Sequence, residues 1–577
     1  MHTRLGTLWI GFVLLAVSCG SPVPATQAPS SSGGASNAPA SSSPGPKRIV
    51  AAISGEPNTF NNTVARAGAG GVAGVDALEQ FVSAGLTQLD DTGVQRAQLA
   101  EAVPSVDNGL WKVNADGTME TTWRIKPGAT WHDGTPLMAD DLLFTVQVGE
   151  DKEIPALSNS AYNSIESVTA PDPSTVTVHW KKPFIQADTM FSYDLALPLP
   201  KHLLEKAFED DKAGFTQVPY WTTAFVGAGP FRVKEFSLGS FIILSANDAY
   251  VLGRPKVDEV EIRFMRDPNA LIASILSGNV ELTMGRGLSL EQAVQVRDNW
   301  QGGKLGVVLS SWIAAYPQML NPTPAAIADA RFRQALLTAV DRQQMVDSLQ
   351  AGQSMVAHSY LSPKEAQYST VEQGIVRYDY DTRRAMTLME SVGYVRGADG
   401  LLRDAAGQPL TMEVRTTGGD DLQEKTLFSM ADNWQRLGVT VDPVVVPPQR
   451  AQDREYRANF PALEEVRQPN DLTTGSLTRY YGPESSLPEN NYRGSNRMRY
   501  SSVELNGLID RFYTTIPQGE RGQVLSGIIH HMTDQVIPLG MFYNAQPAMI
   551  GNRLVNVGPG GATTATPAWN SAQWDVK

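Results

Sequence analysis

The side chains best suited to chemistry are few in this sequence. It has one cysteine, Cys19, and seven histidines among 577 residues. A single thiol cannot form an intramolecular disulfide, and it excludes a zinc or iron–sulfur site built from several cysteines. His530 and His531 are adjacent in a predicted helix, so they point to different faces and cannot chelate one ion as an i, i+4 pair does. We therefore expect no metal site and no cofactor.

Sequence motifs for covalent catalysis are missing as well. The chain contains no His-Glu-x-x-His motif, no Walker loop and no Gly-x-Ser-x-Gly elbow. The nearest serine context, at 235–239, lacks the first glycine. A Ser–His–Asp triad scattered along the chain stays open, because one sequence does not show which residues meet in space. An enzyme, such as a secreted peptidase, is thus the least favoured functional class.

The position of Cys19 predicts its chemistry. Residues 1–18 carry Arg4, then an apolar run at 8–17 that is too short to span a bilayer, which is typical of a secretory signal. Residues 16–19 resemble a bacterial lipobox, in which the cysteine is lipidated and becomes the new N-terminus. One departure is Ala16, where leucine is usual. The alternative, a buried core thiol, is disfavoured because no core sequence surrounds position 19.

The next segment is a low-complexity stretch. Of the 27 residues at 20–46, 23 are Ser, Pro, Gly or Ala, and none is charged. Such a composition buries too little apolar area to offset its ordering entropy. We predict a disordered tether between a lipidated Cys19 and a folded body. No later apolar stretch reaches the length of a transmembrane helix, so membrane attachment is expected only through the N-terminus.

Overall composition fits a globular body of several domains. Hydrophobic residues make up 42% and charged residues 19%, and at roughly 150 residues per domain the length suggests three or four units. The net charge of −13 leaves no basic face, which disfavours a nucleic-acid partner.

Short strands alternate with amphipathic helices along the body, which indicates an α/β class. Period-two patterns predict strands over 48–53, 119–125 and 175–180, the second of them in a hairpin after the Asp116-Gly117 turn. Apolar residues at i, i+3, i+4, i+7 and i+8 predict a helix over 331–341. A second helix is expected over 381–393, capped by Asp381 and ended by Gly393.

Several motifs follow one another along this body. They lie at 99–102, 116–125, 131–141, 226–231, 276–281, 331–342 and 538–543. In this order and spacing they resemble the family 5 extracellular solute-binding proteins, the receptors of peptide- and nickel-type ABC importers. Within 131–141, Asp133-Gly134 is a turn, and Asp140 and Asp141 fall in a helix's first turn, where the dipole favours acids. His132 and Asp133 are therefore interpreted as fold geometry and not as a catalytic pair.

The resemblance implies a fold and a domain plan. The fold would be α/β and periplasmic-binding-protein-like, with two lobes, a hinge, and an extra domain inserted in lobe I. Carried onto this chain, the boundaries are 1–18 signal peptide, 19–46 lipidated cysteine and tether, 47–85 lobe I, 86–217 extra domain, 218–306 lobe I, 307–535 lobe II and 536–577 lobe I. The hinge crossings are expected near 307–311 and 535–538. Ligand sites commonly form between domains that close on each other.

Peptide-binding members place an aspartate of lobe II against the peptide's α-ammonium, and the matching segment here is 460–471. The acid motif is not reproduced. Arg467 falls about where the acid is expected, with Glu464, Glu465 and Asp471 close by. A guanidinium offers a fixed fork of donors suited to a carboxylate or phosphate. Either Arg467 faces the cleft and meets an anionic group of the solute, oriented by the nearby acids, or it pairs with Glu464 or Glu465 on a lobe surface.

Four aromatic residues near the expected crossings are further ligand candidates. They are Trp312 and Tyr316 after the first crossing, and Phe542 and Tyr543 after the return. Aromatic rings near a hinge can line a cleft and stack on a ligand, or can belong to the core.

The resemblance predicts a substrate-binding component of an ABC importer, located outside the cytoplasm and attached to the cell membrane by lipid. It would bind peptides or a similarly sized polar solute, act as a monomer, and deliver the solute to the permease and ATPase complex. The alternative is a cell-envelope scaffold or regulator that kept the fold without the ligand.

Overall fold

The computed structural model describes residues 45–67, 72–470, 472, 475–561 and 565–577. Cys19, the predicted signal segment, nearly all of the tether and Asp471 lie outside them. In the described ranges no helix combines the length and the apolar character needed to cross a membrane.

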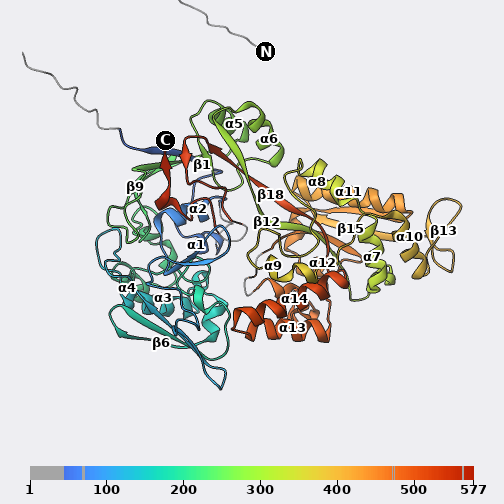
Figure 1. The fold of residues 1–577 in the computed structure, drawn as a ribbon, viewed down its shortest axis with the longest axis horizontal. Helices are drawn as coiled ribbons and strands as arrows, with labels where there is room; N and C mark the ends of the chain where they lie inside the picture. Colours follow the sequence, from blue (N-terminus) through green and yellow to red (C-terminus); the bar gives the residue numbers. More distant parts are fainter. Residues whose placement is uncertain (1–44, 68–71, 471, 473–474, 562–564) are drawn as a thin grey trace, which may run out of the picture. The chain divides into compact units, whose positions relative to one another are not determined.

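Among the described residues, ten strands form one mixed sheet through the body of the chain (Figure 1). Their order is β16 (Thr440–Val446), β15 (Thr411–Thr417), β17 (Leu463–Pro469), β12 (Gly303–Pro317), β18 (Leu539–Gly551), β11 (Leu282–Thr283), β1 (Arg48–Ile53), β10 (Glu259–Phe264), β9 (Phe241–Ala246) and β8 (Phe231–Ser237). We call β16, β15 and β17 the lobe II strands, and β11, β1, β10, β9 and β8 the lobe I strands. β12 and β18 belong to both groups.

The long strands β12 and β18 form the ribbon that joins the two groups. β17 pairs with β12 only over 311–317, and β11 joins β18 only at Ile550. Between these places, residues 307–311 of β12 run opposite 544–547 of β18, with a bulge between Leu309 and Ser311. The expected first crossing therefore lies in this ribbon, whereas its partner in the ladder is 544–547 and not 535–538. The latter segment precedes β18 and contacts lobe II, because Gln535 accepts hydrogen bonds from Arg333.

Helices cover both faces of the lobe II strands. They are α7 (Ala330–Thr338), α8 (Arg342–Leu349), α10 (Thr382–Ser391), α11 (Asp421–Leu437), α13 (Val503–Thr514) and α14 (Gln518–Asp534). Residues of α7, α8, α10 and α11 share one apolar core with Ile313 and Ala315. Residues of α13 and α14 share another with Trp312 and Tyr316. The alternation of β12 side chains between two cores follows from the strand period of two.

The lobe I strands are covered in the same way. Ile49, Ala51 and Ile53 of β1 pack in a core with α2 (Val75–Val82) and Trp574, while Ala52 packs against α5 (Pro268–Leu276) and α6 (Leu290–Asn299). Trp574 is fully buried in this core.

A second sheet lies in the segment expected to be the extra domain. Its strands fall within 111–180, a stretch described without gaps, in the order β4 (Trp111–Val113), β5 (Met119–Arg124), β7 (Thr175–Trp180) and β6 (Ile165–Asp172). α3 (Ala139–Glu150) and α4 (Lys201–Asp210) accompany this sheet. Two of the sequence motifs meet here: His132 accepts a hydrogen bond from the Gly227 amide on Nδ1 and lies 3.0 Å through Nε2 from the Gly229 carbonyl. His132 thus supports the fold, and burial lowers its pKa to about 4.

The elements expected from periodicity are present, but the helix expected over 331–341 ends at Thr338 as α7, and Asp341 caps α8. Strands β1, β5 and β7 occupy the predicted stretches, and the β4–β5 hairpin closes around Asp116-Gly117, with Val113 opposite Met119. Asp381 caps α10 by accepting from the Arg383 and Arg384 amides, and Gly393 takes a φ of +90° after its end. Among the described residues, the remaining α-helices are α1 (Asn62–Ala67), α9 (Tyr368–Val371) and α12 (Arg454–Ala458). The remaining strands there form the short pairs β2 (Thr87–Leu89) with β3 (Gln95–Ala97), β13 (Val395–Arg396) with β14 (Leu402–Arg403), and β19 (Leu554–Val555) with β20 (Asp575–Val576).

Candidate functional site: charged residues at the strand ends

Both strand groups contain parallel strands whose carboxyl ends carry charged residues. In lobe II, β15 runs parallel to β16 and β17, and in lobe I, β1 runs parallel to β10 and β11. In open α/β sheets, ligands bind in the crevice outside the carboxyl ends of the strands. The residues to consider are therefore those at the end of β17, after β15, and after β11.

Arg467 lies near the carboxyl end of β17 and forms an ion pair with Asp420. Its Nη1 is 2.5 Å from Oδ2 of Asp420, and about a quarter of each side chain is exposed. Asp420 is the N-cap of α11, where its carboxylate also accepts from the Gln423 amide at 3.3 Å. A carboxylate at a helix N-terminus is stabilised by the helix dipole. The ion pair is therefore held at the carboxyl ends of β15 and β17.

The expected pairing of Arg467 with Glu464 or Glu465 is wrong. Glu464 and Arg467 are three residues apart on β17, so their side chains point to opposite faces of the sheet. It lies opposite Tyr316, whereas Arg467 lies opposite Ile313. Glu465 shares the Arg467 face, but its carboxyl group is bonded to Thr416 and Gln423. Neither acid orients the guanidinium, and Asp420 does so instead.

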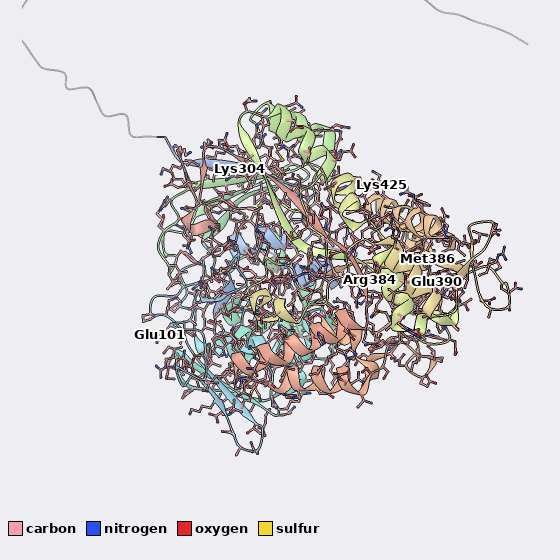
Figure 2. The ribbon with its side chains drawn as sticks, turned by 45° about the vertical axis from the view of Figure 1, so that its right-hand side comes forward. Glu101, Lys304, Arg384, Met386, Glu390 and Lys425 are labelled. Atoms are coloured by element: carbon pink, nitrogen blue, oxygen red, sulfur yellow. The ribbon has the colours of Figure 1, made fainter. Side chains whose placement is uncertain are left out.

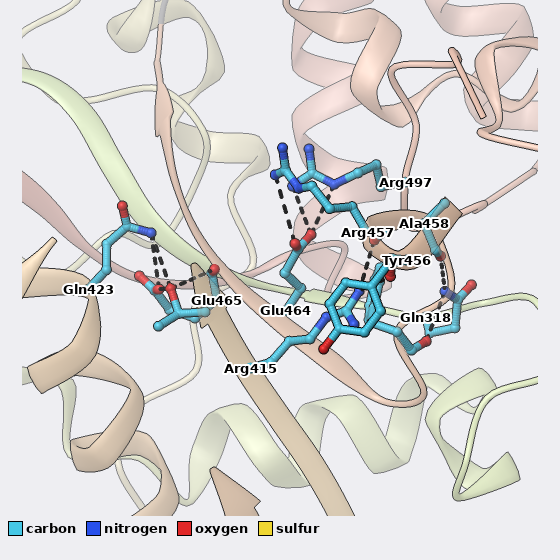
Figure 3. A network of polar contacts seen from close by, with 11 residues as sticks. Gln318, Arg415, Gln423, Tyr456, Arg457, Ala458, Glu464, Glu465 and Arg497 are labelled. Atoms are coloured by element: carbon cyan, nitrogen blue, oxygen red, sulfur yellow. Dashed lines mark hydrogen bonds and ion pairs between the residues drawn. The ribbon is translucent and has the colours of Figure 1, made fainter. Parts of the chain in front are cut away.

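Glu464 is the centre of a buried arginine cluster (Figure 3). Its side chain is only 4% exposed, and its Oε2 accepts from Nη2 and Nε of Arg497 at 2.7 and 3.0 Å. Nη2 of Arg457 lies 3.9 Å from Oε1. Arg415, opposite Glu464 on β15, is held by the Tyr456 and Arg457 carbonyls at 2.9 Å. Burial alone would lower the pKa of Arg497. The negative charge of Glu464 and its hydrogen bonds have the larger effect, so the pKa of Arg497 is raised. These guanidinium groups neutralise Glu464 internally.

Glu465 is a buried carboxylic acid. It is 1% exposed, and Oε2 accepts from the Thr416 hydroxyl and from Nε2 of Gln423, the latter at 3.2 Å (Figure 3). Within the described part of the chain, no hydrogen-bond partner lies near Oε1. Burial raises the pKa of Glu465 to about 8. At neutral pH this group is therefore uncharged, and it cannot bind an ammonium group by charge.

The aromatic candidates lie in the cores on either side of the ribbon. Trp312, Tyr316 and Tyr543 share one core, Phe542 lies in the other, and all four are at most 2% exposed. Trp312 meets Tyr360 edge to face at 5.8 Å, and the Tyr543 hydroxyl donates to the Ser359 carbonyl at 3.0 Å. In this structure these rings pack against protein. A ligand contact by the four stays a prediction.

Arg286 joins the site from lobe I, and the sequence did not reveal it. It follows β11 after Met284 and Gly285, so it lies at the carboxyl end of a parallel strand. Its side chain is exposed to water, yet protein surrounds it closely enough that desolvation lowers its pKa. The Arg467 charge lowers this pKa further, while Asp420 and Asp76 raise it. The charges of the Arg467–Asp420 pair thus act on the pKa of Arg286. Only its place after a short strand and a glycine could have suggested it.

Comparison with known proteins decides the family. The sequence profile of the bacterial extracellular solute-binding proteins, family 5 (middle region), matches residues 101–483, more than half of the chain. The chain belongs to this family. The oligopeptide-binding protein AppA of Bacillus subtilis is 26% identical over 402 residues, which are 69% of each protein. A nickel-binding periplasmic protein of Escherichia coli is 24% identical over 353 residues, 58% of this chain and 64% of its own length. The chain thus spans about two thirds of the length of these relatives.

The fold class is confirmed by solved structures. That of AppA from Bacillus subtilis in complex with a nonapeptide covers 92% of this chain and 100% of its own, with a TM-score of 0.65 at 21% identity. Structures of this kind have two lobes, as expected from the sequence motifs. The predicted class, a substrate-binding protein of an ABC importer, is confirmed as well.

Proposed function

We propose that this family member binds a peptide or a similarly sized polar solute between the carboxyl ends of the lobe I and lobe II strands, and delivers it to an ABC permease. The observation that carries this proposal is the Arg467–Asp420 ion pair at the carboxyl ends of the lobe II strands, in a chain of the solute-binding family. Strand ends from two lobes supply a site to which each lobe contributes charged groups.

Closure would follow from differential binding. A solute that contacts both sets of strand ends binds the closed form better than the open form, and so shifts the equilibrium toward closure. The ribbon of 307–311 and 544–547 is the narrowest part of the sheet among the described residues, and it is the natural place for the bending. The permease would then read the closed form. No covalent step is needed, and the protein acts without catalysis.

The solute class is suggested by the relatives. AppA is named for oligopeptides, and the Escherichia coli relative is named for nickel. Glu464 and Glu465 are neutralised within the protein, so neither supplies a free carboxylate for a peptide's α-ammonium. At the ends of β15 and β17, the charged groups of the ion pair are the Arg467 guanidinium and the Asp420 carboxylate, which are already matched to each other. A peptide would therefore be held by other groups, or the solute is another polar molecule of that size.

The remaining parts of the chain fit a receptor at the outer face of the cell membrane. In this proposal Cys19 carries the lipid, residues 20–46 form the tether, and one copy of the body serves one permease. The body would divide into lobe I at 47–85, 218–306 and 536–577, the extra domain at 86–217, and lobe II at 307–535.

Mass spectrometry of the native protein tests the function. The protein is purified without denaturation, unfolded, and the released small molecules are identified. We expect one solute class in stoichiometric amount. Adding it back should raise the melting temperature, since a ligand of the folded form adds about 2.7 kcal/mol of stability at a hundredfold excess over Kd. It should also compact the protein in solution scattering. If peptides, sugars and chelated metals all fail to bind, the scaffold alternative is correct.

A further inference from the structure

A small cavity lies among the elements of lobe II, beside the two strands of the ribbon. Trp312 of β12 and Gly540 of β18 line it, together with Arg342 of α8, His358 and Tyr378. Its volume is about 20 Å³, whereas one water-sized body needs roughly 10–15 Å³. The cavity therefore has room for one monatomic ion or one water molecule, and it is too small for a carboxylate or phosphate group.

Arg342 is a buried cation in the wall of this cavity, with only 4% of the residue exposed. Its Nη1 donates to the Gly540 and Ala357 carbonyls at 3.0 and 3.2 Å, and its Nη2 donates to the Tyr378 carbonyl. These acceptors are neutral, and no carboxylate of the described chain forms an ion pair with Arg342. A buried charge is costly unless an opposite charge compensates it. The cavity wall thus carries a positive charge that the described residues leave uncompensated.

Three side chains that line the cavity have nitrogen atoms without a partner. Among the described residues, no hydrogen bond is made by Nε of Arg342, by Nε1 of Trp312 or by Nδ1 of His358. Trp312 is only 2% exposed, so water at the protein surface does not reach its N–H group. The hydroxyl of Thr533 is already bonded to the Ile529 carbonyl. In the described chain no carboxylate lines the cavity, so its wall offers N–H donors and no acid.

The charge state of His358 agrees with this donor character. Burial and the positive charges of Arg342 and Arg377 lower its pKa to about 4, against a smaller upward effect of the exposed Asp379. At neutral pH the ring is therefore uncharged and retains one N–H group that it can donate. The positive potential that opposes protonation of His358 favours an anion at the same place.

We propose that this cavity is a binding site for a monatomic anion of the size of chloride. Arg342 supplies the opposite charge, and the ring nitrogens of Trp312 and His358 donate to the ion. Because Trp312 lies on β12 and Arg342 is bonded to β18 through Gly540, the ion would hold α8 against both strands of the ribbon. The inference goes beyond the proposed function, since this ion is not the transported solute and a peptide does not fit the cavity.

Two measurements on the whole purified protein test the site. In the first, thermal unfolding is followed in sodium chloride, sodium bromide and sodium gluconate at equal ionic strength, so that screening is the same. Gluconate is the reference, because it is too large for the cavity. In the second, crystals grown without halide are soaked in sodium bromide, and anomalous diffraction locates the bromide ions.

The variants remove one donor each. Trp312→Phe keeps an aromatic ring without the N–H group, and His358→Leu keeps a side chain of similar size without ring nitrogens. The matched control is Trp434→Phe, at a buried tryptophan of lobe II whose Nε1 donates to the Leu336 carbonyl at 2.8 Å. For each protein the compared quantity is the shift between chloride and gluconate, so that a general loss of stability cancels.

Chloride and bromide should raise the melting temperature of the wild type above its value in gluconate, and the effect should saturate. Bromide should lie in the cavity beside Arg342, Trp312 and His358. Trp312→Phe and His358→Leu should each raise the apparent Kd for chloride about tenfold, because a hydrogen bond to a charged group is lost. Trp434→Phe should keep the Kd of the wild type.

Three results would overturn the inference. The first is an equal melting temperature of the wild type in the halides and in gluconate. The second is a chloride Kd of Trp312→Phe or His358→Leu that equals that of Trp434→Phe. The third is bromide at the protein surface alone, which would show an adventitious ion only.

Discussion

Removing the Glu464 charge should destabilise lobe II strongly. The carboxylate is 4% exposed and lies within 4 Å of Arg497 and Arg457. Breaking a buried ion pair from one side costs about 3–5 kcal/mol, because a charge remains without compensation. Glu464→Gln keeps the shape and one acceptor oxygen, and Arg497 retains some contact with water. The expected loss of unfolding free energy is therefore somewhat below that range, about 2–3 kcal/mol.

Urea unfolding at neutral pH, followed by tryptophan fluorescence, measures this loss. A changed midpoint with an unchanged m-value indicates a change in stability alone. The matched control is Glu390→Gln on α10, an exposed acid (Figure 2), which should change stability by less than about 0.5 kcal/mol. Adding Arg497→Met to Glu464→Gln should recover part of the loss, because it removes the stranded charge. If Glu464→Gln behaves like Glu390→Gln, the cluster does not stabilise the lobe.

Three further predictions concern protonation, attachment and binding. Burial raises the pKa of Glu465 to about 8 from 4.5, so the folded chain keeps a proton that the unfolded chain releases. The contribution of this proton to stability is full below about pH 4.5 and is lost as the pH rises through 8. Glu465→Gln should reduce the fall in unfolding free energy over this range, by up to about 1.4 kcal/mol per pH unit, and an unchanged slope would contradict a buried neutral acid. Glu79 and Asp188, whose pKa values burial also raises, to about 8 and about 6, contribute to the slope that remains in this variant. Cys19→Ser should release the protein from the membrane fraction, and retention there would disprove lipid attachment through this residue. Arg467→Ala should weaken binding of the natural solute about tenfold or more, with partial rescue by Arg467→Lys, which lacks the planar fork; equal affinity would place Arg467 outside the site.

Local patterns in the sequence were enough to locate many elements. The alternation at 119–125 and the Asp116-Gly117 turn predicted a hairpin that is present, and the acid at Asp381 predicted the start of α10. Such features depend on neighbouring residues, so that a single sequence reveals them. The ordered motifs added the two-lobed fold, which periodicity alone could not supply.

The site was only partly predictable, because its contacts join distant segments. Arg467 was found because it falls about where peptide-binding members of the family carry an acid. Its partner Asp420 lies on another element and is brought close by the parallel pairing of β15 and β17. The burial of Glu464 depends on arginines from β15, α12 and the loop before α13. Arg286 belongs to the opposite lobe. None of these distances is encoded in a short motif.

The surroundings of the two glutamates on β17 explain the ligand chemistry proposed for this chain. A strand in this position could present a carboxylate to a cationic ligand, and two glutamates stand there. One of them is matched by arginines of its own lobe, and the other is held as a neutral acid by burial. A carboxylate so neutralised has no charge left for a solute. The charged group that remains near the carboxyl end of β17 is then the guanidinium of Arg467, which is paired with Asp420. In the proposed site a cationic group of the solute would therefore meet a guanidinium and a carboxylate that is already paired, which disfavours its binding there.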